Sequence, residues 1–264
     1  MKIGICTNMN ATDDGGVGYG QISLAAQLGF EYIELPLVQI SELDERTFQD
    51  VLAVVRQEGI PCEACNNLLP GRVKLTGDGV DHDIIREYAE RAFSRAALLG
   101  ARILVLGSAD ARRLPDGYEN KRANAQMVEA LHILVDMLPS KEMRIVLEPL
   151  CRLECNYLHT MDECLELARV ADMPEVGCLA DFYHFDIEHD SLHGIENAGE
   201  LLWHVHIANP EGRVMPTEKE AARYAPFFQA LKRIQYDSRI SIEANSVDFE
   251  QDAQIGLRYL RSAV

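Results

Sequence analysis

The sequence predicts an α/β protein, a (β/α)8 or TIM barrel that occupies residues 1–264 as a single domain. Three observations favour this fold. The length of 264 residues is close to that of one such barrel. Short β-branched or apolar runs alternate with longer segments of helical periodicity. Eight such runs can be distinguished, which is the number of strands that closes the barrel.

The predicted strands are short, and each leads into a polar loop. They are KIGIC (2–6), YIELP (32–36), CEACN (62–66), RILVLG (102–107), RIVLEP (144–149), VGCLAD (176–181), HVHIAN (204–209) and RISIEA (239–244). Segments 83–100 and 125–138 place apolar residues every three or four positions, as amphipathic helices do. Glycine ends several helical segments just before a strand, as in QLGFEYIEL and LLGARILVL. The β-then-α order requires parallel strands joined by helical crossovers.

A doubly wound sheet is the alternative α/β arrangement. It would more often have five to seven strands and a glycine-rich phosphate turn after the first. The loop after the first predicted strand does contain GGVGYG, but it lacks the G-x-G-x-x-G spacing and follows a long polar segment. We therefore interpret these glycines as a source of loop flexibility, not as a dinucleotide site.

Composition excludes several classes of function. The hydrophobic share of 47% provides a large core, and 25 Lys and Arg against 42 Asp and Glu give a net charge of -17. This charge repels phosphate backbones, and no basic patch offsets it, so we expect no nucleic-acid partner. The apolar run near the N-terminus is too short for a signal peptide or a membrane span, so we expect a cytoplasmic protein without a membrane partner.

The cysteines do not resemble a disulfide framework. Seven of them, an odd number, are scattered along the chain, as is typical of reduced core thiols. Cys62 and Cys65 form a C-x-x-C pattern inside a predicted strand. Residues three apart on a strand point to opposite faces, so we expect that these two thiols do not share a ligand.

Four predicted strands end in carboxylate or imidazole groups. These are Glu148, Asp181, His206 and Glu243. The carboxyl ends of barrel strands meet at one mouth, so we expect the four groups to converge. Burying a carboxylate at the end of a strand costs free energy unless the charge is paired or bound to a cation. Several such strand ends in succession therefore favour a bound metal. Three carboxylates and one imidazole suit Mn²⁺ best, with Mg²⁺, Co²⁺ and Zn²⁺ as alternatives.

Other polar residues lie near these positions. Of His204 and His206, we expect only one to face the barrel axis, and we choose His206 because it lies nearer the carboxyl end. His184, three residues beyond Asp181, suits a donor to a substrate oxygen better than a metal ligand. For Glu34, at the end of the second strand, we leave open a substrate contact or a salt bridge. Arg112 and Arg113 are either phosphate ligands or solvated surface side chains.

At these residues the chain resembles the sugar isomerase/epimerase superfamily, which has the xylose isomerase-like barrel, and most nearly its ketose 3-epimerase branch. The similar segments are EPLCRLECNYLHT, DFYHFDIEHD, HVHIANPEGRVMP and RISIEAN. The resemblance implies that Glu148, Asp181, His206 and Glu243 bind a divalent metal, and that Glu148 and Glu243 are the catalytic acid/base pair.

The resemblance also implies substrate contacts. It assigns them to Glu154, His184 and Arg213. Arg213 comes seven residues after His206, and this spacing differs from that in the best-characterised epimerases. The loops after the first and third strands match no specificity that can be read from the sequence. A homodimer or homotetramer is the family habit.

The expected function is a metal-dependent isomerase or epimerase of a small sugar, sugar phosphate or polyol ketone. Proton transfer would pass through a metal-stabilised enediolate between Glu148 and Glu243. Loss of a β-hydroxyl after the same proton abstraction would give a dehydratase of inosose or dehydroshikimate type, which is the second interpretation. A sugar-binding barrel without catalysis and an abasic-site endonuclease are weaker alternatives. The endonuclease needs additional strand-end histidines and a basic face, which the sequence lacks.

Overall fold

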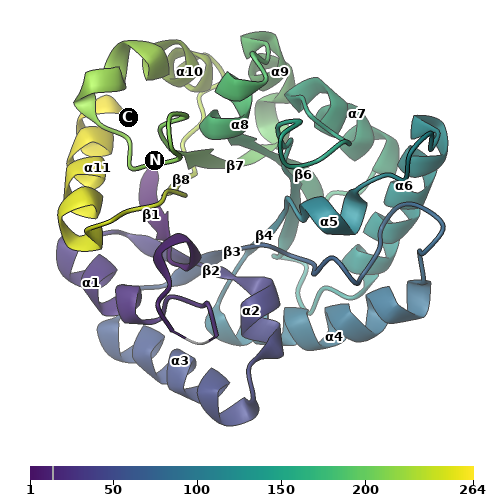
Figure 1. The fold of residues 1–264 in the computed structure, drawn as a ribbon, viewed down its shortest axis with the longest axis horizontal. Helices are drawn as coiled ribbons and strands as arrows, with labels where there is room; N and C mark the ends of the chain where they lie inside the picture. Colours follow the sequence, from purple (N-terminus) through teal and green to yellow (C-terminus); the bar gives the residue numbers. More distant parts are fainter. Residues whose placement is uncertain (14) are drawn as a thin grey trace.

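The computed structural model, which describes residues 1–13 and 15–264, contains a closed parallel barrel. The eight strands pair in chain order, and β1 pairs with β8 to close the ring. Looking along the barrel, Figure 1 shows the strands around the centre and the helices around the outside. The predicted (β/α)8 barrel is therefore confirmed.

The strands lie close to their predicted positions. They are β1 (Lys2–Cys6), β2 (Tyr32–Pro36), β3 (Cys62–Asn66), β4 (Ile103–Leu106), β5 (Arg144–Leu147), β6 (Val176–Asp181), β7 (Leu202–Ile207) and β8 (Arg239–Ile242). Strands β4, β5 and β8 end one or two residues earlier than predicted, and β7 is shifted towards the N-terminus by two.

The helices follow the predicted alternation, with additional short ones in the loops. They are α1 (Gly20–Leu28), α2 (Leu37–Glu42), α3 (Glu45–Glu58), α4 (His82–Leu99), α5 (Ala109–Arg112), α6 (Asn120–Asp136), α7 (Met161–Ala171), α8 (Phe182–Ile187), α9 (Leu192–Ala198), α10 (Ala221–Arg233) and α11 (Phe249–Ala263). Short 3-10 turns lie at η1 (Asn8–Asn10), η2 (Gly199–Leu201) and η3 (Glu218–Glu220). Gly29 and Gly100 cap α1 and α4 in the left-handed region, as their position before a strand predicts.

Two layers of apolar side chains hold the barrel together. The larger cluster includes Ile5, Leu35 and Phe93 and packs the outer face of the strands against the helices. A smaller cluster of Ala64, Ile103, Val105, Val146 and Leu179 fills the interior, with Trp203 packed against it. Barrel interiors are filled with side chains in this way, so reactive groups are confined to the mouth.

The C-x-x-C thiols lie on the same side of β3, so the prediction of opposite faces is wrong. The register between β2 and β3 shifts at Cys62, which inserts one extra residue before Ala64. Ala64 then faces the interior, whereas Cys62 and Cys65 both pack in the outer cluster. A hydrogen bond with the Cys62 thiol and burial raise the pKa of Cys65 well above its usual range. Within the described residues, no other ligand group completes a metal-binding cluster around this pair.

One glycine of the GGVGYG loop after β1, Gly18, serves close packing, which corrects for this residue the interpretation as a source of loop flexibility. Gly18 has a φ of 72°, and a Cβ there would overlap the carbonyl of Thr7. The side chain of Asp13 accepts hydrogen bonds from the backbone N–H groups of Val17 and Gly18. Asp14, in the same loop, lies outside the described residues. No helix in the described part of the chain is long and apolar enough to cross a membrane.

Candidate active site

The four predicted metal ligands converge at the carboxyl end of the barrel. Glu148 follows β5, Asp181 ends β6, His206 lies in β7 and Glu243 follows β8. One ligand atom from each lies within 4.8 Å of those of the other three, and all four residues are buried. The backbone N–H groups of Glu148 and Glu243 still bond to the neighbouring strands, at 3.3 Å and 3.1 Å, so the barrel fixes both side chains.

This cluster fits a divalent cation. Glu148 Oε1, Asp181 Oδ2 and His206 Nδ1 are buried, and none has a hydrogen-bond partner in the described structure. His206 Nδ1 lies 3.3 Å from Glu148 Oε1 and 3.6 Å from Glu243 Oε2. Buried carboxylate oxygens without partners are costly, and one shared cation would satisfy them together. Three carboxylates with one imidazole form a donor set suited to Mn²⁺ or Mg²⁺ and also acceptable to Co²⁺ or Zn²⁺.

Burial and neighbouring charges shift the pKa values of the ionisable groups in this cluster. Burial raises the pKa of Asp181 to about 7, although the positive charge of Arg213 opposes this shift. Burial acts against the charged form of His206, but Glu34 and Glu243 outweigh it and raise the His206 pKa well above its usual range. For Glu243, burial is outweighed by the charges of Arg213 and His206, which lower its pKa to about 2. Without a cation, protons therefore take part in balancing these charges.

The backbone around β4 shapes the position of Glu148. Gly107 follows β4, and a Cβ at this position would overlap the Glu148 carboxylate. The Arg112 guanidinium is fully buried and donates to the Glu148 carbonyl at 2.7 Å. Arg113 donates to the carbonyl of Glu154 and pairs with Asp110. Arg112 is therefore neither a phosphate ligand nor a solvated surface side chain, which corrects both interpretations made for it.

Gly107→Ala is expected to weaken Mn²⁺ binding by about tenfold or more, because the new methyl group would displace one of the ligands, and disturbing the shell around a metal typically costs 10- to 100-fold in affinity. Gly20→Ala is the matched control, since a Cβ there meets no atom within 4 Å. Titration of each purified variant with Mn²⁺, followed by electron paramagnetic resonance of the free ion, checks the prediction. Equal affinities in the two variants would contradict it.

The three predicted substrate-binding residues form one wall of the same site. Arg213 Nη1 donates to Glu154 Oε1 at 3.0 Å, and Nη2 donates to Glu243 Oε2. The guanidinium also lies over the ring of Tyr183, with 4.5 Å to its centroid. The loop that carries Arg213 is fixed on both sides, because Asn209 bonds to Val214 and Asn245 bonds to the Arg213 carbonyl. The unusual spacing from His206 thus still brings Arg213 into the site.

His184 is oriented as a neutral hydrogen-bond donor. The backbone N–H of Cys151 donates to its Nδ1 at 3.1 Å, so the ring proton is on Nε2. Burial lowers the pKa of His184 to about 3, which keeps the ring uncharged. Nε2 is buried, has no hydrogen-bond partner among the described residues, and lies 3.6 Å from Asp181 Oδ2. The tautomer disfavours metal coordination through Nε2 and suits donation to a substrate oxygen.

A cavity of about 230 Å³ opens beside these groups. It is lined by Asn8, Met9, Asn66, Asn67, Gly107, Ser108, Ala109, Glu148, Leu150, Glu154, His184, Arg213 and Glu243. Asn66, at the end of β3, donates to Glu243 Oε1 at 2.9 Å and to Asn8 Oδ1 at 3.1 Å. Sequence reasoning missed Asn66, although its place at a strand end is the signal that identified the four predicted ligands.

One further buried residue, His204, differs from its prediction, and a second, Glu34, matches one of its two interpretations. His204 faces the barrel interior together with His206, because strand residues two apart lie on the same side. Both imidazoles contact Glu34, at 2.8 Å and 3.0 Å. Glu34 is fully buried, so of its two interpretations the salt bridge describes its contacts.

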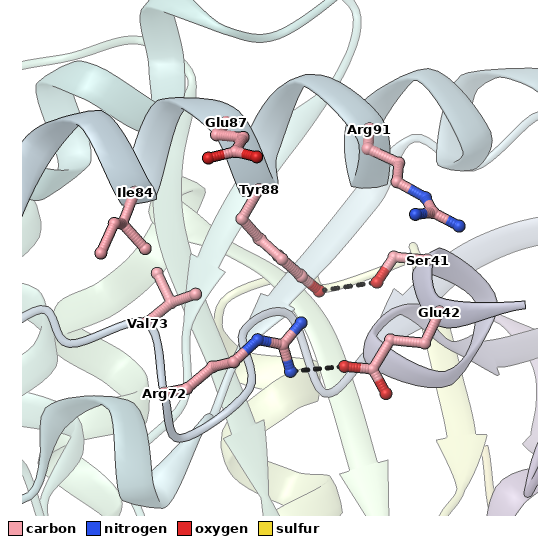
Figure 2. A pocket seen from close by; sticks show the side chains of 8 residues that line it. All are labelled: Ser41, Glu42, Arg72, Val73, Ile84, Glu87, Tyr88 and Arg91. Carbon is pink, nitrogen blue, oxygen red and sulfur yellow. Dashed lines mark hydrogen bonds and ion pairs between the residues drawn. The ribbon is translucent and has the colours of Figure 1, made fainter.

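A second cavity, of about 240 Å³, lies on the flank of the barrel between α2 and α4. Figure 2 shows Arg72 paired with Glu42 across it, and Ser41 bonded to Tyr88. Arg91, on the same side, donates to the carbonyl of Leu43. The arginines that line this cavity already have partners, in contrast to the orphaned atoms of the barrel mouth.

The fold and the site together define a class of protein, the parallel eight-stranded barrels with a cluster of buried acidic and imidazole groups at the mouth. The sequence profile of the Xylose isomerase-like TIM barrel family matches residues 22–263, and the chain belongs to this family.

Named relatives agree with this assignment. A probable ketose 3-epimerase from Synechocystis sp. is 28% identical over 235 residues, which cover 86% of this chain and 77% of the relative. A ketose 3-epimerase from Arthrobacter globiformis is 27% identical over 252 residues, which cover 93% of this chain and 84% of the relative. The solved structure of a D-allulose 3-epimerase from Methylomonas sp. has the same fold, with a TM-score of 0.86 and 23% identity. The match covers 100% of this chain and 97% of that chain. These relatives agree with the predicted enzyme class, sugar isomerase/epimerase.

Proposed function

We propose that this protein is a divalent-metal-dependent ketose epimerase. The observation that carries the proposal is the convergence of four buried ligand groups, three of which keep a ligand atom without a partner in the described part of the chain. A bound cation, with Mn²⁺ favoured, would polarise the substrate carbonyl and stabilise negative charge on its oxygen. The names of the relatives support a ketose as substrate and carbon 3 as the reacting centre.

Glu148 and Glu243 are the proposed acid/base pair. They follow strands β5 and β8, which β6 and β7 separate around the barrel, so their carboxylates reach the site from different directions. One glutamate removes the proton beside the carbonyl, and the other returns a proton from the opposite face of the planar enediolate. The charges of Arg213 and His206 lower the pKa of Glu243 to about 2, so its carboxylate is ionised at neutral pH.

The surrounding residues would hold the substrate oxygens. His184 offers its Nε2–H group as a neutral donor, and Arg213 offers a charged one. Glu154 accepts from Arg213 through Oε1, while its Oε2, 4.0 Å from His184 Nε2, would accept from a substrate hydroxyl in the cavity. Preorganised donors of this kind stabilise charge that develops on an oxygen during proton transfer.

The cavity supports a free sugar over a sugar phosphate. Arg213 is the cationic residue in its lining, and it is already paired with Glu154 and Glu243. A phosphate would therefore meet the carboxylates of Glu148, Glu154 and Glu243 without an available basic side chain. The amide and hydroxyl groups of Asn8, Asn67 and Ser108 suit sugar hydroxyls instead.

The test follows solvent deuterium into a ketose by NMR in the presence of Mn²⁺. Incorporation at carbon 3 together with formation of the 3-epimer is the expected result, and a chelator should stop both. Exchange at carbon 1 with formation of an aldose would instead indicate an isomerase, and loss of water a dehydratase. The free ketose should also react faster than its terminal phosphate, and a faster phosphate would contradict the assignment of the cavity.

A further inference from the structure

A network of buried polar side chains lies behind the proposed metal centre, on the side away from the cavity. Its centre is the carboxylate of Glu34 on β2, which is fully buried. Glu34 Oε1 accepts from His206 Nε2 at 3.0 Å. Glu34 Oε2 accepts from His204 Nε2 at 2.8 Å and from Ser241 Oγ at 2.6 Å. Three donors thus meet one carboxylate across the interior of the barrel.

The direction of these hydrogen bonds fixes the state of the His206 ring. A carboxylate that receives three donors acts as an acceptor, so Nε2 of His206 carries a proton. Nδ1 points towards Glu148 and Glu243, 3.3 Å and 3.6 Å away. A cation bound there would take the place of any proton on Nδ1, while Nε2 keeps its proton for Glu34. A half-turn of the ring would place the N–H group against these carboxylates and would break the bond to Glu34.

We propose that Glu34 is a positioning residue that sets the tautomer and rotation of His206 and thereby presents Nδ1 to the cation. This inference rests on the metal centre of the proposed function. A histidine that binds a metal commonly donates its other ring N–H to a carboxylate, which orients the ring and increases its basicity. His204 holds the second oxygen of Glu34, so the carboxylate cannot turn away from His206 without losing a buried hydrogen bond.

The network extends across the barrel to the neighbouring strands. Because Ser241 gives its proton to Glu34, the Tyr32 hydroxyl donates to Ser241 Oγ, at 2.8 Å. The Tyr32 ring lies against β1 at Gly4, where a Cβ would overlap it. Strands β1, β2, β7 and β8 therefore all contribute to holding one carboxylate in place. A salt bridge with His204 alone would need neither Ser241 nor the space at Gly4.

The test measures Mn²⁺ affinity by electron paramagnetic resonance of the free ion in wild type and in Glu34→Gln. The expected result is a dissociation constant raised by about 10- to 100-fold, because the amide is neutral and keeps one acceptor oxygen where the carboxylate has two for three donors. Glu63→Gln is the matched control. Glu63 is a half-buried carboxylate on β3 that lies at the opposite end of the barrel and pairs with Lys2 and Arg239. The Glu63→Gln substitution should leave Mn²⁺ affinity unchanged.

A second readout separates positioning from stability. The Nε2–H proton of His206 in Mg²⁺-loaded protein should have the downfield chemical shift of a hydrogen bond to a carboxylate in wild type, and it should move upfield in Glu34→Gln. If Glu34→Gln does not fold, Tyr32→Phe removes one support of the network and should weaken Mn²⁺ binding in the same direction by a smaller factor. Wild-type affinity in a folded Glu34→Gln, or in Tyr32→Phe where Glu34→Gln does not fold, would overturn the inference.

The proposed function can fail separately from this inference. A wild-type protein that binds Mn²⁺ but leaves every ketose unchanged would remove the epimerase proposal, and the effect of Glu34→Gln on Mn²⁺ affinity would still decide the inference. A wild-type protein that binds no divalent ion would overturn both.

Discussion

Glu243→Gln is expected to slow ketose epimerisation by about 10²- to 10⁴-fold, the range that a positioned acid or base typically contributes. The substitution keeps the size of the side chain and one oxygen for the metal but removes the group that accepts the proton. Asn66, Arg213 and His206 all contact this carboxylate, so the wild-type geometry is fixed before the substrate arrives. Initial rates with Mn²⁺ at a saturating concentration for each variant measure the effect on the chemical step.

The control for this prediction is Glu250→Gln, which makes the same substitution at an exposed position on α11. Its rate should equal that of the wild type. Glu148→Gln should lose activity to a similar extent, because both proton transfers are needed for each turnover. If Glu243→Gln keeps more than about a hundredth of the wild-type rate with its metal bound, Glu243 is not the acid or base.

The eight strands could be predicted because each is a local apolar run that ends in a polar loop. The runs at β1, β2, β3 and β6 have the predicted bounds. The short helices α2, α5, α8 and α9 were not predicted, since four to seven residues carry too little periodicity to be distinguished from a loop. The start of α6 at Asn120 was placed five residues too late, because its first turn is polar and exposed.

The ligand groups could be predicted for a similar reason, because a charged residue that ends an apolar strand stands out in the sequence. The partners of these groups could not. Glu34 contacts His206 across the barrel, from strands that are not neighbours and from positions 172 residues apart. The bulge that turns Cys62 and Cys65 to the same side depends on the pairing of β2 with β3, which no local pattern encodes. Tertiary pairing therefore sets the part of the site that sequence patterns miss.

Removal of the divalent cation is expected to abolish turnover, and Mn²⁺ is expected to restore it and to raise the melting temperature. The size of this stabilisation should depend on pH. In the metal-free protein, burial raises the pKa of Asp181 to about 7, and Glu34 and Glu243 outweigh burial to raise that of His206. Groups with raised pKa values contribute stability that is fully present below their unfolded pKa values and is lost as pH rises through the folded ones. These two residues should therefore make the metal-free protein less stable as pH rises from about 5 to about 8.

The affinity for the metal should show the opposite trend. A cation must displace the protons of Asp181 and His206, so its affinity should rise with pH by up to about tenfold per unit for each proton displaced. The gain in melting temperature on adding Mn²⁺ should consequently be larger at about pH 8 than at about pH 6, because tighter binding to the folded state stabilises it more. Calorimetry at both values, with Asp181→Asn as the variant that lacks one titrating ligand, checks this dependence. An equal gain at the two pH values in the wild type would mean that the cation displaces no proton, and that the crowded groups at the barrel mouth are not its ligands.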